Sequence, residues 1–397
     1  MSYIQVEEAI ARLCKEGRVL TGIETLALGD CLGRTLAQDL IAPINVPPAD
    51  NSAMDGYALA SEDWVNAESS LEISQRITAG SPPQALTPGT AARIFTGAEI
   101  PPGADIVVMQ EKCSSDGQSV KIDAIGTPGA NIRRLGQDIN SGDTVLTAGW
   151  RLRAQDLGLV ASLGFASIKV FQRLKVAIVS TGEELVEPGT AVKPGQIYNS
   201  NRYMLDGLIK SWDMQTVDLG IIGDDPALIS DALREASEQA DVIVTSGGVS
   251  VGEEDHVKAV VESLGSIDLW RVAIKPGKPF AFGQVCGTPF LGLPGNPVSA
   301  LVTMLIIARP FLLQSQGLAQ NEAKAIRQVA LFDQKVDSRQ VYLRVRMTEN
   351  GAELFSQQSS GVLFSTIWGD GLAVQKPGQA ISKGDSINVI PFAFLGR

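Results

Sequence analysis

The chain has 397 residues, of which 44% are hydrophobic, and its formal net charge at pH 7 is −11. At about 100–200 residues per domain, this length predicts roughly two to four domains, and the hydrophobic content excludes a wholly disordered chain. The acidic balance argues against non-specific binding to nucleic acid or to an anionic membrane surface, although it leaves room for a small basic pocket.

The first 173 residues consist of short segments broken by proline and glycine, such as "APINVPPADNSAMDGYA". Apolar spacing predicts amphipathic helices over residues 4–13 and 156–163. Stretches rich in β-branched residues at 106–109 and 120–122 predict short strands between turns. We therefore expect a discontinuous helical and linker domain from residues 1–45 and 141–173, and a β-rich domain from residues 46–140.

From residue 174 onward, apolar runs and helical patterns alternate. Asp225 is expected to cap a helix whose first residue is Pro226, and another helix is expected to start after Asn201. Further patterns predict strands over 176–179, 217–222, 242–245 and 289–293, helices over 257–264 and 298–308, and a strand pair over 270–274 and 279–283 around "KPGKP". This alternation is typical of an open, mostly parallel sheet that is covered by helices.

The last part of the chain returns to short strands and turns. The predicted fold is therefore multidomain, α/β plus β. A central α/β domain with an open, mostly parallel sheet covers residues 174–325. Pro/Gly-rich β structure precedes it, and a small C-terminal β domain covers residues 326–397.

Four loops fall at one edge of the predicted sheet, namely residues 180–184, 222–226, 245–255 and 292–299. Ligands of open α/β sheets bind beyond the carboxyl ends of the strands, and glycines there let backbone N–H groups approach a phosphate or another oxyanion. Lys275 and Lys278 flank a Pro-Gly turn, have no acid beside them in the sequence, and could project both ammonium groups into the same pocket. Tight turns and solvated lysines are the alternative interpretation, but four such loops at one edge favour a binding site.

The loop "TSGGVSVGEED" contains both a glycine pair and carboxylates. Backbone N–H groups from Gly247 to Ser250 would hold a phosphate, and Asp255 would hold a divalent cation that bridges it. Glu184 and Asp224 lie at the same sheet edge and could complete the cation site. Mg²⁺ accepts one or two protein carboxylates together with phosphate oxygens and water, and it needs no histidine. The alternative is that each acid only caps or begins a helix.

Histidine and cysteine usage narrows the chemistry. His256 is the single histidine, and the four cysteines form no C-x-x-C pair. The chain therefore offers too few histidine and paired cysteine ligands to favour a zinc site, and too few histidines to favour a histidine-based catalytic triad. Neither a dinucleotide-binding fingerprint nor a P-loop is present. The N-terminus lacks the basic region and apolar core of a secretory signal, and the apolar run Val298–Ala308 is too short to span a bilayer. We expect a cytoplasmic protein.

Several of these strings also resemble a known family. "TSGGVSVGEED", "STGEEL", "KPGKPFAFG" and "LPGNPVSA" resemble the central domain of the molybdopterin molybdenumtransferase family, which comprises bacterial MoeA and its gephyrin E-domain relatives. Upstream, "PPADNSAMDGYA", "IFTGAEIPPGAD" and "NIRRLGQD" resemble the same family. The strings occur in order over most of the chain.

The resemblance implies an elongated, four-domain homodimer with a MogA-like α/β domain that makes molybdenum cofactor. It implies Mg²⁺-dependent hydrolysis of molybdopterin adenylate, release of AMP, and insertion of the metal from molybdate as substrate. The active site would lie between the α/β domain of one protomer and the β domain containing the DGYA motif of the other. A handover partner would be the adenylyltransferase of the preceding step, and no nucleic-acid or membrane partner is expected.

The residues and the resemblance together predict three overlapping sets of site residues. The metal ligands are Glu184, Asp224 and Asp255. The catalytic set adds Asp55 and Asp138 to these three. The substrate-binding set is Thr96, Asn201, Gly247, Gly248, Ser250, Lys275, Lys278, Pro294, Gly295, Asn296, Ser299, Arg344 and Ser365. Of these, Asp55, Thr96, Asp138, Arg344 and Ser365 rest on the resemblance alone.

Three other functions remain open at this level. A MogA-type molybdopterin adenylyltransferase shares the α/β domain but not the Pro/Gly-rich first half. A gephyrin-like scaffold would need a partner-binding feature, and the sequence shows none. An unrelated Mg²⁺-dependent nucleotide hydrolase would turn over ATP without molybdate or pterin. The sequence does not distinguish molybdate from tungstate.

Overall fold

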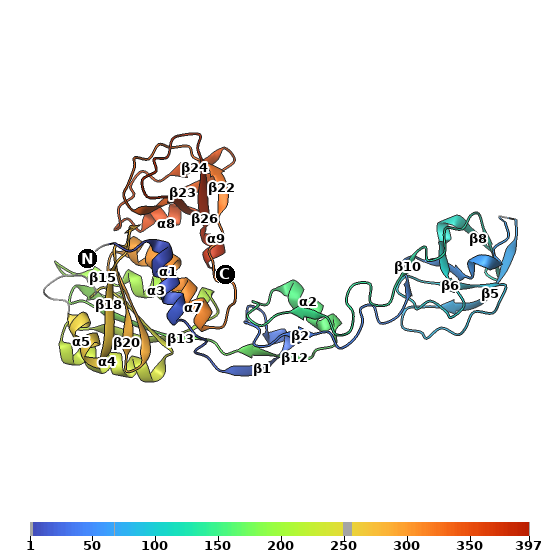
Figure 1. The fold of residues 1–397 in the computed structure, drawn as a ribbon, viewed down its shortest axis with the longest axis horizontal. Coiled ribbons are helices and arrows are strands. Elements are labelled where there is room, and N and C mark those ends of the chain that lie inside the picture. The colour runs from blue at the N-terminus through green and yellow to red at the C-terminus, as the bar shows by residue number, and fades with distance from the viewer. Residues whose placement is uncertain (1–2, 67, 249–255, 397) are drawn as a thin grey trace.

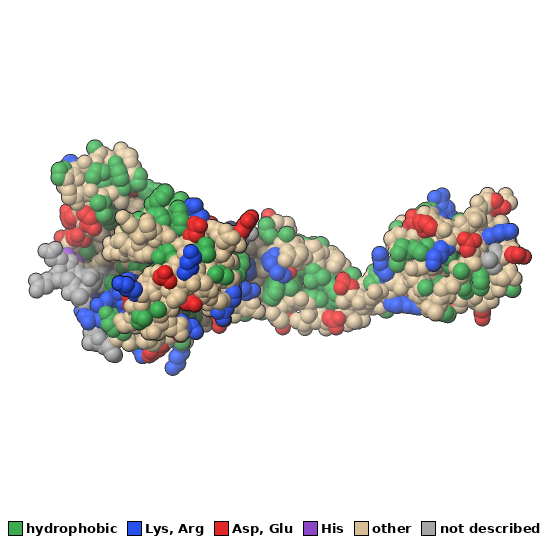
Figure 2. Space-filling model, turned by 90° about the horizontal axis from the view of Figure 1, so that it is seen from above, with side chains coloured by type: hydrophobic (Ala, Val, Ile, Leu, Met, Phe, Trp, Pro, Cys, Tyr) green, Lys and Arg blue, Asp and Glu red, His purple; other side chains and the backbone are tan. Residues whose placement is uncertain are grey.

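The computed structural model describes residues 3–66, 68–248 and 256–396. The molecule is elongated, as Figure 1 shows: the α/β domain and the C-terminal β domain pack side by side at one end, a small domain containing α2 lies next, and a β domain forms the far end. Figure 2 shows the same outline from above, with acidic and basic side chains interspersed over the visible face. This arrangement confirms the predicted multidomain α/β plus β fold.

The α/β domain contains a six-stranded sheet in the order β16-β13-β17-β21-β20-β18. Its parallel strands are β16 (Gln215–Ile222), β13 (Lys175–Thr181), β17 (Val242–Ser246) and β21 (Thr288–Leu293). Two antiparallel strands, β20 (Pro279–Val285) and β18 (Gly265–Arg271), extend one side. The predicted open, mostly parallel sheet is therefore confirmed.

Helices cover both faces of this sheet, and strand β13 shows why its sequence is apolar throughout. Val176 and Ile178 point into one core, whereas Ala177 and Val179 point into another on the opposite face. A strand covered on both sides needs apolar residues at every position, because its side chains alternate between faces. The first face packs against α1 (Val6–Glu16), α3 (Ser200–Ser211) and the continuous run α6 (Pro297–Thr303), η4 (Met304–Ala308) and α7 (Arg309–Ser315), and the second against α4 (Pro226–Gln239) and α5 (His256–Leu264).

Helix starts follow the predicted capping chemistry. The Asp225 side chain accepts hydrogen bonds from the backbone N–H groups of Ala227 and Leu228, and Pro226 is the first residue of α4. Helix α3 begins at Ser200, earlier than the predicted start after Asn201, because the Asn199 side chain accepts the backbone N–H of Arg202 and caps the helix there. These caps satisfy N–H groups that have no partner inside the helix, so the strand-to-helix loops end at defined residues.

The N-terminal helix lies in a different domain from the one predicted. Val6, Ala9 and Leu13 of α1 are each at most 1% exposed and pack into the core of the α/β domain. The prediction that residues 1–45 belong as a whole to the helical and linker domain is therefore wrong for α1. The helix has acids in its first turn and Lys15 in its last, which suits the helix dipole. Burying Leu13 alone contributes about 1.5–3 kcal/mol, and only the α/β core offers that burial.

The remainder of the first half forms the two outer domains. The small domain pairs β1 (Ile23–Ala27) with β12 (Ser167–Phe171) and β2 (Leu40–Ile41) with β11 (Thr144–Leu146), beside α2 (Ala154–Ser162). The β domain contains a sheet in the order β7-β4-β6-β5-β9-β8. Its strands are β4 (Gly56–Leu59), β5 (Ser70–Ile77), β6 (Thr90–Ile94), β7 (Ile106–Met109), β8 (Cys113–Ser115) and β9 (Ser119–Ile122), with β3 (Asn51–Ser52) and β10 (Ile132–Arg133) paired at its base.

The sheet of the C-terminal domain includes one strand, β19, whose neighbours in the sequence belong to the α/β domain. The sheet runs β19-β23-β25-β26-β22, with β24 on β23. The predicted strand over residues 270–274 divides: β18 ends at Arg271, and β19 (Ile274–Lys275) instead pairs in parallel with β23 of the C-terminal sheet. The other elements are β22 (Ile326–Val329), β23 (Gln340–Thr348), β24 (Gly351–Leu354), β25 (Gly371–Gln375), β26 (Ser386–Pro391), α8 (Phe364–Trp368) and α9 (Phe392–Leu395).

The helical run Pro297–Ser315 is long and apolar enough to cross a membrane by length and composition. Its apolar window is 94% buried inside the protein. The run is a core helix of the α/β domain, which explains why it is apolar on all sides.

Candidate active site

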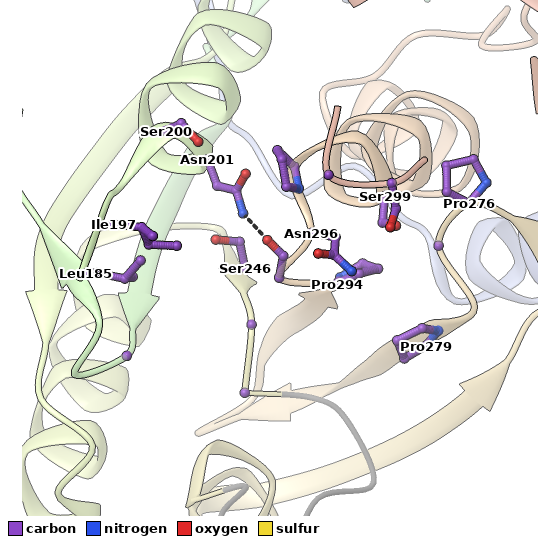
Figure 3. Close-up of a pocket in the computed structure, with 18 of the residues that line it drawn as sticks. Leu185, Ile197, Ser200, Asn201, Ser246, Pro276, Pro279, Pro294, Asn296 and Ser299 are labelled. Atoms are coloured by element: carbon purple, nitrogen blue, oxygen red, sulfur yellow. Dashed lines mark hydrogen bonds between the residues drawn. The ribbon is translucent and has the colours of Figure 1, made fainter. Parts of the chain in front are cut away.

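A cavity of about 1200 Å³ opens at the carboxyl edge of the parallel strands, between the α/β domain and the C-terminal domain. Figure 3 shows residues from the start of α3, the end of β17, the Lys275–Pro279 turn and the loop before α6 facing one space. The predicted residues that line it are Glu184, Asn201, Asp224, Gly247, Gly248, Lys275, Lys278, Pro294, Gly295, Asn296 and Ser299. Ser250 and Asp255 lie outside the described residues.

The glycine pair after β17 forms the floor of this cavity. Gly247 and Gly248 have φ values of +95° and +66°, in the region that disfavours other residues. A Cβ on Gly248 would lie 2.4 Å from Cγ2 of Val257, so the close approach of backbone to α5 also requires glycine. The N–H of Gly247 donates to the carbonyl of Leu293 at 3.0 Å. The expectation that this N–H binds phosphate is therefore wrong, and Gly247 contributes backbone shape instead.

Asn201 connects two of the predicted loops. Its Nδ2 donates to the carbonyl of Gly295 at 2.7 Å, the bond drawn as a dashed line in Figure 3. Its Oδ1 is buried and has no hydrogen-bond partner among the described residues. An acceptor left in this state is costly unless a ligand or water satisfies it. Asn201 lines the cavity and joins the start of α3 to the loop before α6.

Two carboxylates, Glu184 and Asp224, share the cavity wall. Oδ2 of Asp224 accepts the backbone N–H of Glu183 at 3.2 Å, which joins the first two loops. Within the described residues, no group of three His, Cys, Asp or Glu side chains is close enough to hold a metal ion. The predicted third ligand, Asp255, is not described. Glu184 and Asp224 both line the cavity, and one or two protein carboxylates, with substrate oxygens and water as the other ligands, are the set that Mg²⁺ accepts.

Each lysine of the Pro-Gly turn has a partner that comes from far away in the sequence. Nζ of Lys275 donates to Oδ2 of Asp337 at 2.9 Å. Nζ of Lys278 lies 5.3 Å from the centroid of the Tyr3 ring, and its hydrogen bond to the phenol is the main cause that lowers the pKa of Tyr3. The sequence expectation of two lysines without neutralising acids is therefore wrong for Lys275.

The C-terminal domain provides a wall that the sequence did not reveal. Arg339 and residues 358–361 line the cavity, and the backbone N–H of Val298 donates to the carbonyl of Ser360 at 3.0 Å. The sequence of residues 358–361, "QSSG", consists of small polar residues and a glycine, and this composition is typical of surface turns in general. Only the fold brings this segment against the loop before α6.

Arg344 and Ser365 lie together behind this wall. The Arg344 side chain is buried; it donates to Oγ of Ser365 at 3.1 Å, to the carbonyl of Ser359 at 3.2 Å and to the carbonyl of Tyr342 at 3.3 Å. Burial lowers the pKa of Arg344 to about 10. Neither residue belongs to the cavity lining. Both were predicted to bind substrate, and here they hold the loop that faces the cavity.

The remaining predicted residues lie in the β domain at the other end of the chain (Figure 1). Oδ1 of Asp55 accepts the backbone N–H of Thr96 at 2.8 Å and its hydroxyl at 2.7 Å. The backbone hydrogen bond is the main cause that lowers the pKa of Asp55. Asp138 is exposed in the same domain. One chain therefore does not bring these three residues to the cavity between its own α/β and C-terminal domains.

A helix-covered, mostly parallel sheet with glycine loops, acids and lysines at its carboxyl edge defines the class of open α/β domains, whose ligands bind at that edge. Family comparisons specify the class. Residues 177–314 match the "Probable molybdopterin binding domain", residues 4–164 the MoeA N-terminal region (domains I and II), and residues 330–392 the MoeA C-terminal region (domain IV).

The chain belongs to the molybdopterin molybdenumtransferase family and is a transferase of molybdenum cofactor biosynthesis. It is 43% identical over 319 residues to the molybdopterin molybdenumtransferase of Haemophilus influenzae, covering 80% of this chain and 79% of that protein. It is 41% identical over 305 residues to molybdopterin molybdenumtransferase 2 of Mycobacterium tuberculosis, covering 74% and 75%.

Comparison of structures agrees with this assignment. The molybdopterin biosynthesis MoeA protein of Pyrococcus horikoshii superposes with a TM-score of 0.85 at 25% identity, covering 98% of this chain and 99% of that one. The family predicted from the sequence strings is confirmed. The match of the first half to the MoeA N-terminal region favours this family over a MogA-type adenylyltransferase.

Proposed function

We propose that the chain hydrolyses molybdopterin adenylate in a Mg²⁺-dependent step, releases AMP, and inserts the metal of molybdate into molybdopterin. One observation carries the proposal: a single cavity contains the acids Glu184 and Asp224, the lysines Lys275 and Lys278, and the open backbone at Gly248. The pyrophosphate of the adenylate and molybdate are both anions that need cationic and N–H donors. The divalent cation that neutralises them needs carboxylates.

The described residues divide this work by chemical type. Glu184 and Asp224 would hold part of the Mg²⁺ shell, and the cation would supply charge neutralisation on the pyrophosphate. Gly248 lets the backbone approach the phosphates closely. Lys275 and Lys278 would bind oxyanion oxygens, and Asn201 would hold the start of α3 against the loop before α6, where the substrate binds.

Isosteric substitutions of the acids test this assignment. Glu184→Gln and Asp224→Asn keep the side-chain shape and remove the charge, so AMP release from the adenylate should fall strongly and recover in part at raised Mg²⁺. Glu183→Gln is the matched control, because the exposed Glu183 side chain does not line the cavity. Hydrolysis by Glu184→Gln at the wild-type rate across a Mg²⁺ titration would refute the assignment.

We further propose a homodimer, located in the cytoplasm, in which the β domain of one protomer serves the cavity of the other. The proposal is supported by the position of Asp55, Thr96 and Asp138 at the far end of the chain (Figure 1). The adenylyltransferase of the preceding step is the proposed handover partner.

Complementation between inactive chains tests the shared site. Asp55→Asn and Glu184→Gln chains are each expected to be inactive as homodimers. Mixed heterodimers carry one site with both substitutions and one intact site. Random equimolar mixing should therefore restore about a quarter of the wild-type activity. Verified heterodimers without activity would contradict a site shared between protomers.

A further inference from the structure

The C-terminal domain brings two charged residues to the Lys275 side of the cavity. Strand β19 pairs with β23 in parallel, with Ile274 opposite Gln340 and Lys275 opposite Val341. The backbone N–H of Gln340 also donates to the carbonyl of Ala273 at 2.8 Å. This pairing fixes Lys275 beside the segment just before β23, which contains Asp337 and Arg339.

Asp337 lies between the two cations. Its Oδ2 accepts from Nζ of Lys275 at 2.9 Å, and its Oδ1 lies 3.5 Å from Nε of Arg339. The same Oδ1 accepts the backbone N–H of Arg339 at 3.0 Å. The Asp337 side chain is 17% exposed, against 46% for Lys275 and 29% for Arg339. Lys275 and Arg339 line the cavity, whereas its described lining does not include Asp337.

The Asp337 side chain is held in its charged, deprotonated form by its surroundings. Burial alone would raise its pKa, but the hydrogen bonds from Lys275 and from the backbone of Arg339, with the positive charges of both side chains, outweigh burial and lower the pKa. Asp337 therefore neutralises one of the two positive charges that Lys275 and Arg339 present to the cavity.

We propose that Asp337 is an internal counter-anion of an oxyanion subsite made by Lys275 and Arg339, and that an incoming tetrahedral oxyanion takes its place as their main hydrogen-bond partner. The inference rests on the proposed function in taking this cavity as the site of an oxyanion. It adds Arg339 as a binding residue and Asp337 as a specificity-determining residue. An ammonium group has three N–H donors and a guanidinium has five, so both cations can turn part of their donors to a ligand. The nearby carboxylate repels the ligand and keeps its binding weak and reversible.

Two substitutions at Asp337 separate this role from a merely structural one. Asp337→Asn keeps one oxygen acceptor, for either Lys275 or the backbone N–H of Arg339, replaces the other oxygen with an amide nitrogen, and removes the negative charge. Asp337→Ala removes both the acceptor and the charge. If Asp337 only positions the two cations, both Asn and Ala lose positioning contacts and should bind oxyanion no more tightly than the wild type. If it is a counter-anion, Asn should bind oxyanion more tightly than the wild type, by about fivefold for a partly exposed ion pair.

The experiment is isothermal titration of the full-length protein with sodium molybdate, sodium sulfate and sodium phosphate in separate runs. Asp231→Asn on α4 is the charge-matched control, since this exposed acid does not line the cavity. We expect Asp337→Asn to bind at least one oxyanion about fivefold more tightly than both the wild type and Asp231→Asn. The gain should disappear in the Lys275→Gln background.

Unchanged or weaker binding of all three anions by Asp337→Asn would overturn the inference, as would a gain that persists in Lys275→Gln or the absence of binding in every protein tested. Failure of the proposed function is distinguishable. A gain for sulfate or phosphate alongside no conversion of molybdopterin adenylate would retain the counter-anion and reject the reaction.

Discussion

Arg344→Met tests whether this arginine acts on substrate directly or through the cavity wall. In the structure the guanidinium is buried and connects β23 to the cavity wall through the carbonyl of Ser359 and to α8 through Oγ of Ser365, and it also donates to the carbonyl of Tyr342 in β23 itself. Methionine fills similar space without donors. The three acceptors would lose their partner, and the wall would be held to β23 by fewer hydrogen bonds, among them those of the Gln358 side chain to the Arg344 backbone.

The expected cost is worked from these contacts. Each lost hydrogen bond to a charged donor is worth about 1.5–3 kcal/mol, but the three are not additive, and methionine avoids the desolvation of a buried charge. We expect the C-terminal domain to lose about 2–4 kcal/mol of unfolding free energy. Ser365→Ala removes one acceptor and leaves Nε without that partner, and should cost about 1–2 kcal/mol.

Urea unfolding and amide hydrogen exchange over residues 355–365 measure this effect, with molybdate-dependent activity followed in parallel. Ser356→Ala is the matched control, because this exposed serine does not line the cavity and the Arg344 side chain donates to Ser359, Ser365 and Tyr342 instead. Exchange in this segment should rise in Arg344→Met and stay unchanged in the control. Wild-type stability and exchange in Arg344→Met, combined with lost activity, would refute the supporting role and indicate direct contact with substrate.

Three further outcomes are expected. Hydrogen bonds, chiefly from the Arg153 side chain, lower the pKa of Asp156 from 3.8 to about 2; since the folded-state pKa is depressed, Asp156→Asn should cost about 2 kcal/mol at neutral pH, and urea unfolding should show this difference vanish as pH falls from about 4 to about 2. Gly248→Ala places a Cβ 2.4 Å from Val257 at positive φ, so adenylate hydrolysis should drop roughly tenfold or more while circular dichroism stays unchanged. Asn201→Ala loses the bond to Gly295 and should raise the KM for the adenylate about fivefold with little change in Tm; an unchanged KM would exclude Asn201 from substrate binding.

Local signals predicted the α/β domain well. Asp225 followed by Pro226 marked a helix start, and the apolar run of β13 marked a strand covered on both faces. Ligands of open α/β sheets bind at the carboxyl edge of the parallel strands, and this rule predicted that four loops lie at one site. The cavity is lined by residues from all four loops.

The contacts that the sequence did not reveal join parts of the chain that are far apart. Lys275 and Asp337 are 62 positions apart, and they meet only because β19 leaves its own domain to pair with β23. Helix α1 has an ordinary amphipathic pattern. Such a pattern predicts that one face is buried, but it does not indicate which domain's core buries that face. Arg344 matched a family position, but its burial behind the wall depends on packing rather than on local pattern.

The most direct test of the proposed reaction is a single product balance. The purified protein is incubated with molybdopterin adenylate and Mg²⁺, with and without molybdate, and AMP is measured beside the cofactor that activates an apo-molybdoenzyme. We predict AMP release that requires Mg²⁺, and active cofactor that appears in equimolar amount with AMP only when molybdate is present. AMP release without Mg²⁺, or AMP released with molybdate but without active cofactor, would contradict the proposed reaction.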